Sequence, residues 1–174
     1  MLRLLLLRHS KAVPFVGSSD RDRALTERGK ADAARLGAFI ADKEIAPQAA
    51  AHSGARRTRE TLAIVLGKLQ PGLQASVEPR LYEATNATFL RILRDRPDAA
   101  KVLLLVGHNP SMGEMACHLA ASGDRSALAK MAAKFPTSAL AVIDFDADHW
   151  DEIEEGAGRL IHFATPASLG SRDD

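Results

Sequence analysis

An arginine and a histidine, Arg8 and His9, directly follow an apolar run from Leu4 to Leu7 near the start of the chain. An apolar run of this length that ends in charged residues is typical of a buried parallel strand. In open α/β sheets, ligands bind beyond the carboxyl ends of such strands. A neutral imidazole can attack phosphorus, and a guanidinium can hold phosphate oxygens with paired hydrogen bonds. The pair therefore points to phosphoryl-transfer chemistry.

Three later segments repeat this pattern of an ionisable residue at the end of an expected strand. The expected strands 48–52, 74–78 and 101–106 are followed by Arg57, Glu83 and His108, respectively. Random placement would scatter such residues over both edges of the sheet and over the helices. Because the carboxyl ends of parallel strands meet at one edge, we expect these side chains to form one site.

The residue types at these strand ends suit a specific reaction. A phosphate monoester or phosphoramidate is dianionic near neutral pH, so its pocket needs cationic donors, here Arg8, Arg57 and a protonated His108. His9 must be neutral to attack, so its other ring nitrogen should donate to a backbone carbonyl or a similar acceptor. The product is a phosphohistidine intermediate that water hydrolyses. Glu83 would protonate the leaving group and then activate the water.

Composition narrows the class of protein. The chain has 174 residues, of which 46% are hydrophobic, which suits one domain over residues 1–166 with a flexible tail at 167–174. A net charge of +1 does not favour a nucleic-acid surface, and no stretch is long and apolar enough for a membrane span or a secretory signal. We expect a cytoplasmic protein with no cofactor and no metal site. The single Cys117 is expected to be a small buried hydrophobe.

Strand-like and helix-like periods alternate along the chain. Helices are expected after the N-cap residue Thr26, through Leu62–Leu69 and Phe89–Leu93, from a capping-box spacing at Ser111–Glu114 to Gly123, and around 127–133. Segments 140–145 and 160–163 read as two closing strands with an antiparallel edge. The alternation predicts a three-layer α/β/α sandwich with a mostly parallel central sheet and an antiparallel edge strand.

Five segments of the chain resemble motifs of the histidine phosphatase superfamily, the group that includes phosphoglycerate mutase. They are the Arg-His pair in Leu7–Ser10, the segment Ser53–Thr61 with its arginine at 57, Val106–Pro110 with its second histidine, Leu81–Glu83 at the acid/base position, and Leu25–Gly29 at the opening of the first helix. The short length and the segments 8–11 and 107–112 look most like the small SixA-type phosphohistidine phosphatases. The resemblance runs from about Leu2 to Phe145.

The resemblance implies that Arg8, His9, Arg57 and His108 are catalytic, with Glu83 as acid and base. Small members of the family vary at the acid position. An imidazole that leaves from phosphohistidine needs less acid help than an alkoxide, so an enzyme of this subgroup could work without Glu83. An exposed loop carboxylate is the alternative interpretation of that residue.

The residues beside the two histidines are candidates for substrate binding. Ser10 stands where the superfamily usually has glycine, and Ser10 and Lys11 belong to the loop nearest the expected nucleophile. Asn109 could orient His108 or donate to phosphate. The role of the polar loop 13–23 stays open.

The expected function is a metal-independent phosphatase with a histidine nucleophile that removes phosphate from phosphohistidine on a protein. The chain looks too short to carry the insertions that cover the site in larger mutases, and an open site suits a protein surface. One alternative is a phosphatase of a small phosphorylated metabolite. Another, from a different class, is a phosphate-binding adaptor without turnover. The expected partners are therefore a phosphorylated protein or a small phosphorylated substrate, not nucleic acid or membrane.

Overall fold

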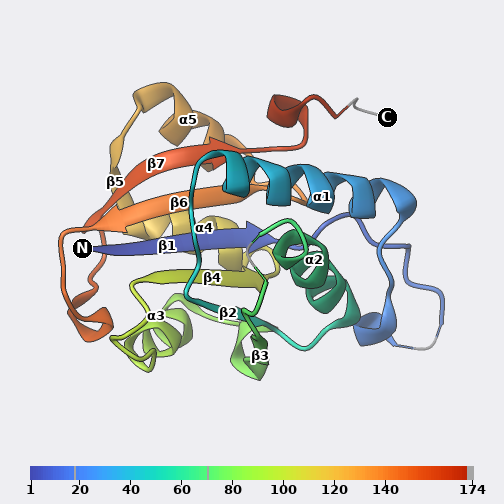
Figure 1. Ribbon diagram of the computed structural model, residues 1–174, viewed down its shortest axis with the longest axis horizontal. Coiled ribbons are helices and arrows are strands. Elements are labelled where there is room, and N and C mark those ends of the chain that lie inside the picture. The colour runs from blue at the N-terminus through green and yellow to red at the C-terminus, as the bar shows by residue number, and fades with distance from the viewer. Residues whose placement is uncertain (18, 70, 172–174) are drawn as a thin grey trace.

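The computed structural model describes residues 1–17, 19–69 and 71–171, in which the strands form one seven-stranded sheet (Figure 1). The order across the sheet is β3-β2-β4-β1-β6-β7-β5. The strands are β1 (Leu2–Arg8), β2 (Ala49–His52), β3 (Ala75–Val77), β4 (Val102–Gly107), β5 (Ala120–Gly123), β6 (Leu140–Phe145) and β7 (Gly158–Ala164).

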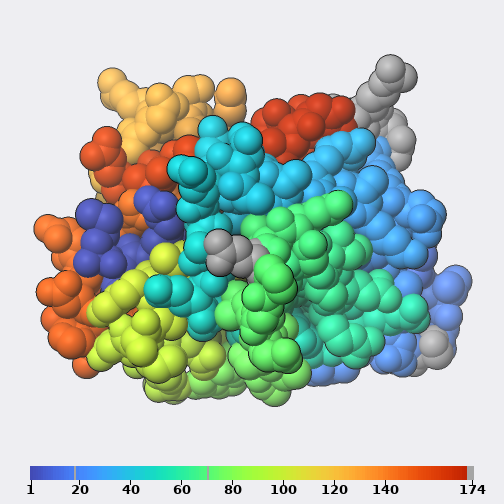
Figure 2. All heavy atoms as spheres, in the orientation of Figure 1, coloured from blue at the N-terminus to red at the C-terminus, as the bar shows by residue number. Residues whose placement is uncertain are grey.

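Helices cover both faces of this sheet. They are α1 (Glu27–Asp42), α2 (Arg56–Leu66), α3 (Asn86–Arg94), α4 (Ser111–Leu119) and α5 (Arg125–Ala133), with short 3₁₀ helices η1 (Asp20–Asp22), η2 (Pro79–Leu81), η3 (Trp150–Glu152) and η4 (Ala167–Leu169). Alternate β1 side chains enter two apolar cores, Leu5 and Leu7 beneath α1 and α2, and Leu4 and Leu6 beneath α3, α4 and α5. Figure 1 shows α1 and α2 in front of the sheet and α4 behind it. Figure 2, in the same orientation, shows the front layer closing over the strands.

The predicted three-layer α/β fold with a mostly parallel sheet is confirmed, but the antiparallel strand is not at the edge. Strand β6 pairs antiparallel with both β1 and β7, whereas every other neighbouring pair in the described sheet is parallel. The edge beyond β7 is instead taken by β5, in residues expected to end a helix. The backbone turns extended at Ala120, the C-cap of α4, and Gly123 has a φ of +135° where it approaches Leu160. The short Ala-Ala-Ser-Gly sequence carries no alternation that predicts a strand.

Three local expectations have different outcomes. Thr26 caps α1 as predicted, because its hydroxyl accepts from the Gly29 amide at 3.0 Å. The capping box at Ser111 is absent, since Pro110 is the N-cap of α4 and the Ser111 hydroxyl donates to the Ala84 carbonyl at 2.6 Å. Cys117 is exposed rather than buried, because it lies on the outer side of α4.

The C-terminal segment also differs from expectation. The tail expected at 167–174 begins with the short helix η4, while residues 172–174 lie outside the described residues. In the part of the chain that the structure describes, no helix has the length and apolar character needed to cross a membrane.

The sheet order brings three strand ends together. Arg8 pairs in register with Gly107 of β4, and His52 of β2 pairs with Val106 of the same strand. Strands β2, β4 and β1 are adjacent and parallel, so the residues that follow them emerge side by side at one edge.

Candidate active site

A cavity of about 560 Å³ lies at this carboxyl edge of the sheet. The predicted site residues that line it are Arg8, His9, Arg57, Glu83, His108 and Asn109. The structure therefore brings together groups that are up to 101 positions apart in the sequence, counting from Arg8 to Asn109 (109 − 8).

His9 is held as a neutral ring. Its Nδ1 lies 2.7 Å from the Ser10 carbonyl oxygen, which can only accept, so Nδ1 carries the proton and Nε2 keeps its lone pair. The Arg57 Nε–H donates to that Nε2 at 3.3 Å. Burial, together with the positive charges of Arg57 and Arg8, lowers the pKa of His9 to about 4. The ring thus presents a nucleophilic nitrogen at neutral pH.

Arg57 is buried in the first turn of α2, and two edges of its guanidinium have different partners. Toward the loop, Nη1 donates to the Asp20 carbonyl at 2.7 Å and Nη2 to the Asp20 carboxylate at 2.9 Å. Toward the sheet, Nε faces His9 Nε2 and Nη2 lies 3.2 Å from His108 Nδ1. The Nε/Nη2 edge is thereby aimed at both imidazoles.

His108 has the opposite tautomer. A guanidinium can only donate, so Nδ1 accepts from Arg57, and Nε2–H donates to the Ser53 hydroxyl at 2.7 Å. The Ser53 hydroxyl donates a hydrogen bond to Thr58 Oγ1 at 3.0 Å, and the Thr58 hydroxyl donates to the Ala55 carbonyl at 2.8 Å.

The surroundings of His108 do not favour the protonated ring that the sequence analysis expected. Burial lowers the pKa of His108 to about 3, and the neighbouring His9 and Arg57 act in the same direction. The ring is therefore neutral unless a negatively charged group in the pocket raises its pKa.

Arg8, the last residue of β1, contributes a half-buried cation. Its Nη1 donates to the Phe135 carbonyl at 3.1 Å, and burial lowers the pKa of its guanidinium. Its Nε is buried without a hydrogen-bond partner among the described residues. Arg8 lines the cavity, so its positive charge can stabilise an anion that binds there.

Glu83 and Asn109 lie at the rim of the cavity. Glu83 is exposed there. The Asn109 side chain donates to the Phe135 carbonyl at 2.8 Å and accepts from the Gly113 amide at 3.2 Å. Its amide thus holds the turn between β4 and α4.

Ser10 and Lys11 do not line this cavity. Ser10 is fully buried, its amide donates to Thr61 Oγ1 at 3.0 Å, and its hydroxyl accepts from Ser138 Oγ at 2.6 Å. It packs behind the site because the loop after β1 turns inward. Lys11 is exposed and lines a neighbouring cavity of about 840 Å³.

Three residues that sequence reasoning did not assign complete the site: Asp20, Tyr82 and Ser53. The Tyr82 hydroxyl donates to Asp20 Oδ2, and Arg23 Nη1 donates to Asp20 Oδ1 at 3.0 Å. The Tyr82 hydrogen bond, followed by those of Arg23 and Arg57, holds the pKa of Asp20 far below its usual range. The sequence held only weak signals for two of these residues. Tyr82 is the only tyrosine of the chain and stands next to Glu83, and Asp20 is a carboxylate among the arginines of loop 13–23.

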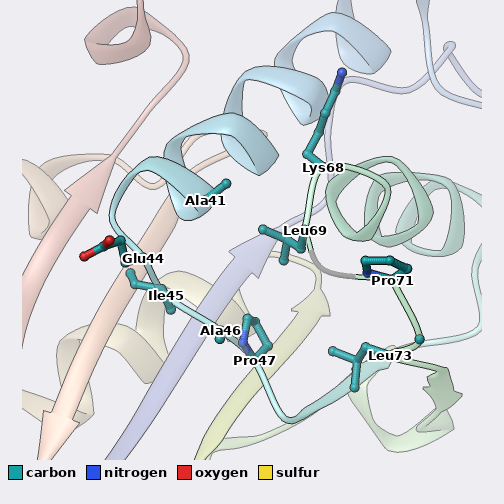
Figure 3. A pocket seen from close by; sticks show the side chains of 10 residues that line it. Ala41, Glu44, Ile45, Ala46, Pro47, Lys68, Leu69, Pro71 and Leu73 are labelled. Atoms are coloured by element: carbon teal, nitrogen blue, oxygen red, sulfur yellow. The ribbon is translucent and has the colours of Figure 1, made fainter.

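A separate hollow of about 730 Å³ lies away from these groups (Figure 3). Figure 3 shows it between the end of α1, with Ala41 and Glu44, and the segment after α2, with Leu69 and Pro71. Pro47, just before β2, also lines it, so it lies near the amino end of that strand. It holds neither an arginine nor a histidine.

Comparisons with known proteins show which family the sequence and the fold resemble. A sequence model of the histidine phosphatase superfamily, branch 1, matches residues 4–89. An uncharacterized protein of Mycobacterium tuberculosis is 35% identical over 164 residues, which are 92% of this chain and 99% of that protein. A structure from Agrobacterium tumefaciens, provisionally assigned as the phosphohistidine phosphatase SixA, is 30% identical with a TM-score of 0.77 and covers 95% of this chain and 98% of that one. The protein histidine phosphatase SixA complexed with tungstate shares the fold, with a TM-score of 0.74 at 20% identity over 97% of this chain and 99% of that one.

Proposed function

Because the chain belongs to the histidine phosphatase superfamily and is of the SixA type, we propose that it is a phosphatase that acts on phosphohistidine in a protein, with His9 as nucleophile. One observation carries this proposal. The Ser10 carbonyl holds the proton of His9 on Nδ1, so the lone pair of Nε2 is directed into the cavity beside Arg57.

The dianionic phosphoryl group would bind along the Nε/Nη2 edge of Arg57. Two of its oxygens would replace His9 Nε2 and His108 Nδ1 as acceptors of that edge. The added negative charge would raise the pKa of His108, so that a protonated Nδ1 could donate to phosphate. The guanidinium of Arg8, which also lines the cavity, supplies a further positive charge.

In the first chemical step, the lone pair of His9 Nε2 forms a bond to phosphorus as the bond to the leaving group breaks. The electron pair of the broken bond stays on the leaving group. The Nδ1–H of His9 continues to donate to Ser10, which stabilises the phosphorylated ring. Each well-aimed donor to the developing oxyanion typically contributes about 3 to 4 kcal/mol.

A water oxygen then forms a bond to phosphorus as the bond from phosphorus to His9 Nε2 breaks. The electron pair of that bond returns to Nε2, and inorganic phosphate leaves. Glu83 at the rim is the group proposed to activate this water and to protonate a leaving group that needs a proton, such as an alkoxide. No group of three or more His, Cys, Asp or Glu side chains within residues 1–17, 19–69 and 71–171 could hold a metal ion.

A protein is the proposed substrate because the rim is open. Glu83 is exposed, and the side chain of Asp20 is 43% exposed at the mouth of the cavity. A phosphorylated side chain on a protein surface could therefore reach the nucleophile. The assignment of the Agrobacterium tumefaciens relative supports the same class of substrate.

The test compares the wild type with His9→Ala and with the control His118→Ala, a histidine in α4 outside the site. Turnover of p-nitrophenyl phosphate, with and without chelator, should vanish only in His9→Ala and should not respond to chelator. Activity that survives His9→Ala would reject the nucleophile.

A second panel identifies the substrate class. The wild type is assayed by kcat/KM on a phosphohistidine peptide, a phosphohistidine-bearing protein and small phosphomonoesters. A preference for a small ester would replace the protein substrate with a metabolite. Phosphate binding without turnover of any of them would indicate an adaptor.

A further inference from the structure

Asp20 and His9 occupy opposite ends of one guanidinium. Nε of Arg57 contacts the nucleophilic nitrogen of His9, whereas Nη1 and Nη2 hold the carbonyl and the carboxylate of Asp20. In an in-line phosphoryl transfer, the leaving group departs from the side opposite the nucleophile. The leaving group therefore departs away from the buried His9 and toward the mouth of the cavity, where Asp20 lies partly exposed.

The Asp20 carboxylate has room for one more hydrogen bond. A carboxylate offers about four lone-pair positions. Arg57 and Tyr82 use Oδ2, and Arg23 uses Oδ1. Since the side chain is 43% exposed at the mouth of the cavity, the remaining position on Oδ1 can meet a substrate.

This carboxylate accepts hydrogen bonds but does not act as a proton donor. The hydrogen bond from Tyr82, with those from Arg23 and Arg57, keeps the pKa of Asp20 well below its usual range, so the group is ionised at neutral pH. A charged acceptor at this place suits a leaving group that carries an N–H.

We propose that Asp20 is a specificity-determining residue that selects phosphohistidine over phosphomonoesters by accepting a hydrogen bond from the substrate imidazole. The donor is the N–H of the ring nitrogen that does not carry the phosphate, which is present in the protonated, cationic form of the phosphohistidine ring and which the negative charge of Asp20 favours. The inference rests on the proposed function, because it assumes a phosphohistidine substrate.

The chemistry balances without a proton from the enzyme. His9 Nε2 bonds to phosphorus, the substrate P–N bond breaks, and its electron pair remains on the substrate nitrogen. The proton on the other nitrogen, held by Asp20, stays there, so a neutral imidazole leaves. An alkoxide leaving from a phosphomonoester must gain a proton, which the ionised Asp20 does not hold.

The experiment compares Asp20→Asn with Asp22→Asn, which removes one negative charge from an exposed position of the same short helix. For each protein, kcat/KM is measured on a phosphohistidine peptide and on p-nitrophenyl phosphate. Hydrogen bonds to a charged acceptor are about twice as strong as neutral ones. Asp20→Asn should lower the ratio of the two kcat/KM values at least tenfold, or about 1.4 kcal/mol, and Asp22→Asn should keep it. Asp20→Glu, which returns the charge, should recover part of the preference.

An unchanged ratio in Asp20→Asn overturns the inference. If kcat/KM then falls equally for both substrates, Asp20 only positions Arg57. If kcat/KM changes for neither substrate, Asp20 has no part in the reaction. A wild type that does not hydrolyse phosphohistidine overturns the proposed function as well. That failure is recognised before any variant is made.

Discussion

The two site histidines should titrate far below the usual range and should carry their protons on opposite nitrogens. The experiment is an acid titration of the protein without substrate, from pH 7.5 to 2.5. Burial and neighbouring charges lower the pKa of His9 from 6.5 to about 4 and that of His108 to about 3. For His9 the difference of 2.5 units (6.5 − 4) corresponds to about 3 kcal/mol in favour of the neutral ring. At pH 7 about one His9 ring in a thousand is then protonated.

Nitrogen-15 NMR of the imidazoles measures both properties directly. We expect the proton on Nδ1 in His9, where Ser10 accepts it, and on Nε2 in His108, where Ser53 accepts it. Spectra of His9→Asn and His108→Asn assign the signals. Because the rings are coupled, the pair should show two steps, both below pH 5. A step near pH 6.5 from either ring, or the same tautomer in both, would refute the account of the site.

The shift of His9 also determines how the protein responds to acid. An unfolded histidine takes up a proton near pH 6.5, but folded His9 does so only near pH 4, so the unfolded state binds more protons between these values. The free energy of unfolding should therefore fall as the pH drops through this window, by about 3 kcal/mol from His9. Urea unfolding at pH 7 and 4.5 should show a smaller loss in His9→Asn. An equal loss in both proteins would contradict the proposed burial of the neutral ring.

Three further substitutions test the other groups of the site. Arg57→Lys keeps the charge but loses the paired donors, so kcat/KM for p-nitrophenyl phosphate should fall about a hundredfold or more. The control Arg59→Lys, at an exposed position of the same helix, should retain activity. Equal kcat/KM values in the two variants would reject the role of the guanidinium edge. Ser53→Ala leaves the Nε2–H of His108 without its buried acceptor, so the free energy of unfolding in urea should fall by about 1 to 3 kcal/mol. The NMR spectrum should show a mixture of the two tautomers of His108. An unaltered spectrum would show that Ser53 does not orient the ring. Glu83→Gln should lower kcat/KM more for phenyl phosphate than for p-nitrophenyl phosphate, because phenolate is the poorer leaving group and needs a proton. Equal losses on the two substrates would show that Glu83 is not the acid.

The fold and four of the site residues could be predicted because they follow from a short-range pattern. Apolar runs such as 102–106 define buried parallel strands, and parallel strands deliver the residues after them to one edge. Arg8, His9, Arg57 and His108 therefore meet whatever the details of the loops. The sheet edge was predicted less well, since β5 has four residues and gains its partners only by packing beside β7.

Other properties depend on contacts between segments that are distant in the sequence. Ser10 was expected in the pocket, but Thr61 and Ser138 draw it behind the site. Asp20 lies in a loop with no periodic pattern, and its place beside Arg57 comes from how that loop folds over α2.

The amino-acid sequence by itself determined which chemical groups stand at the carboxyl edge of the sheet, because strand periodicity and chain order are local properties. Only the tertiary structure decided their protonation, orientation and charge partners. A pKa and a tautomer depend on burial and on donors or acceptors within a few ångströms, and for His9, His108 and Asp20 most of these neighbours come from remote parts of the chain.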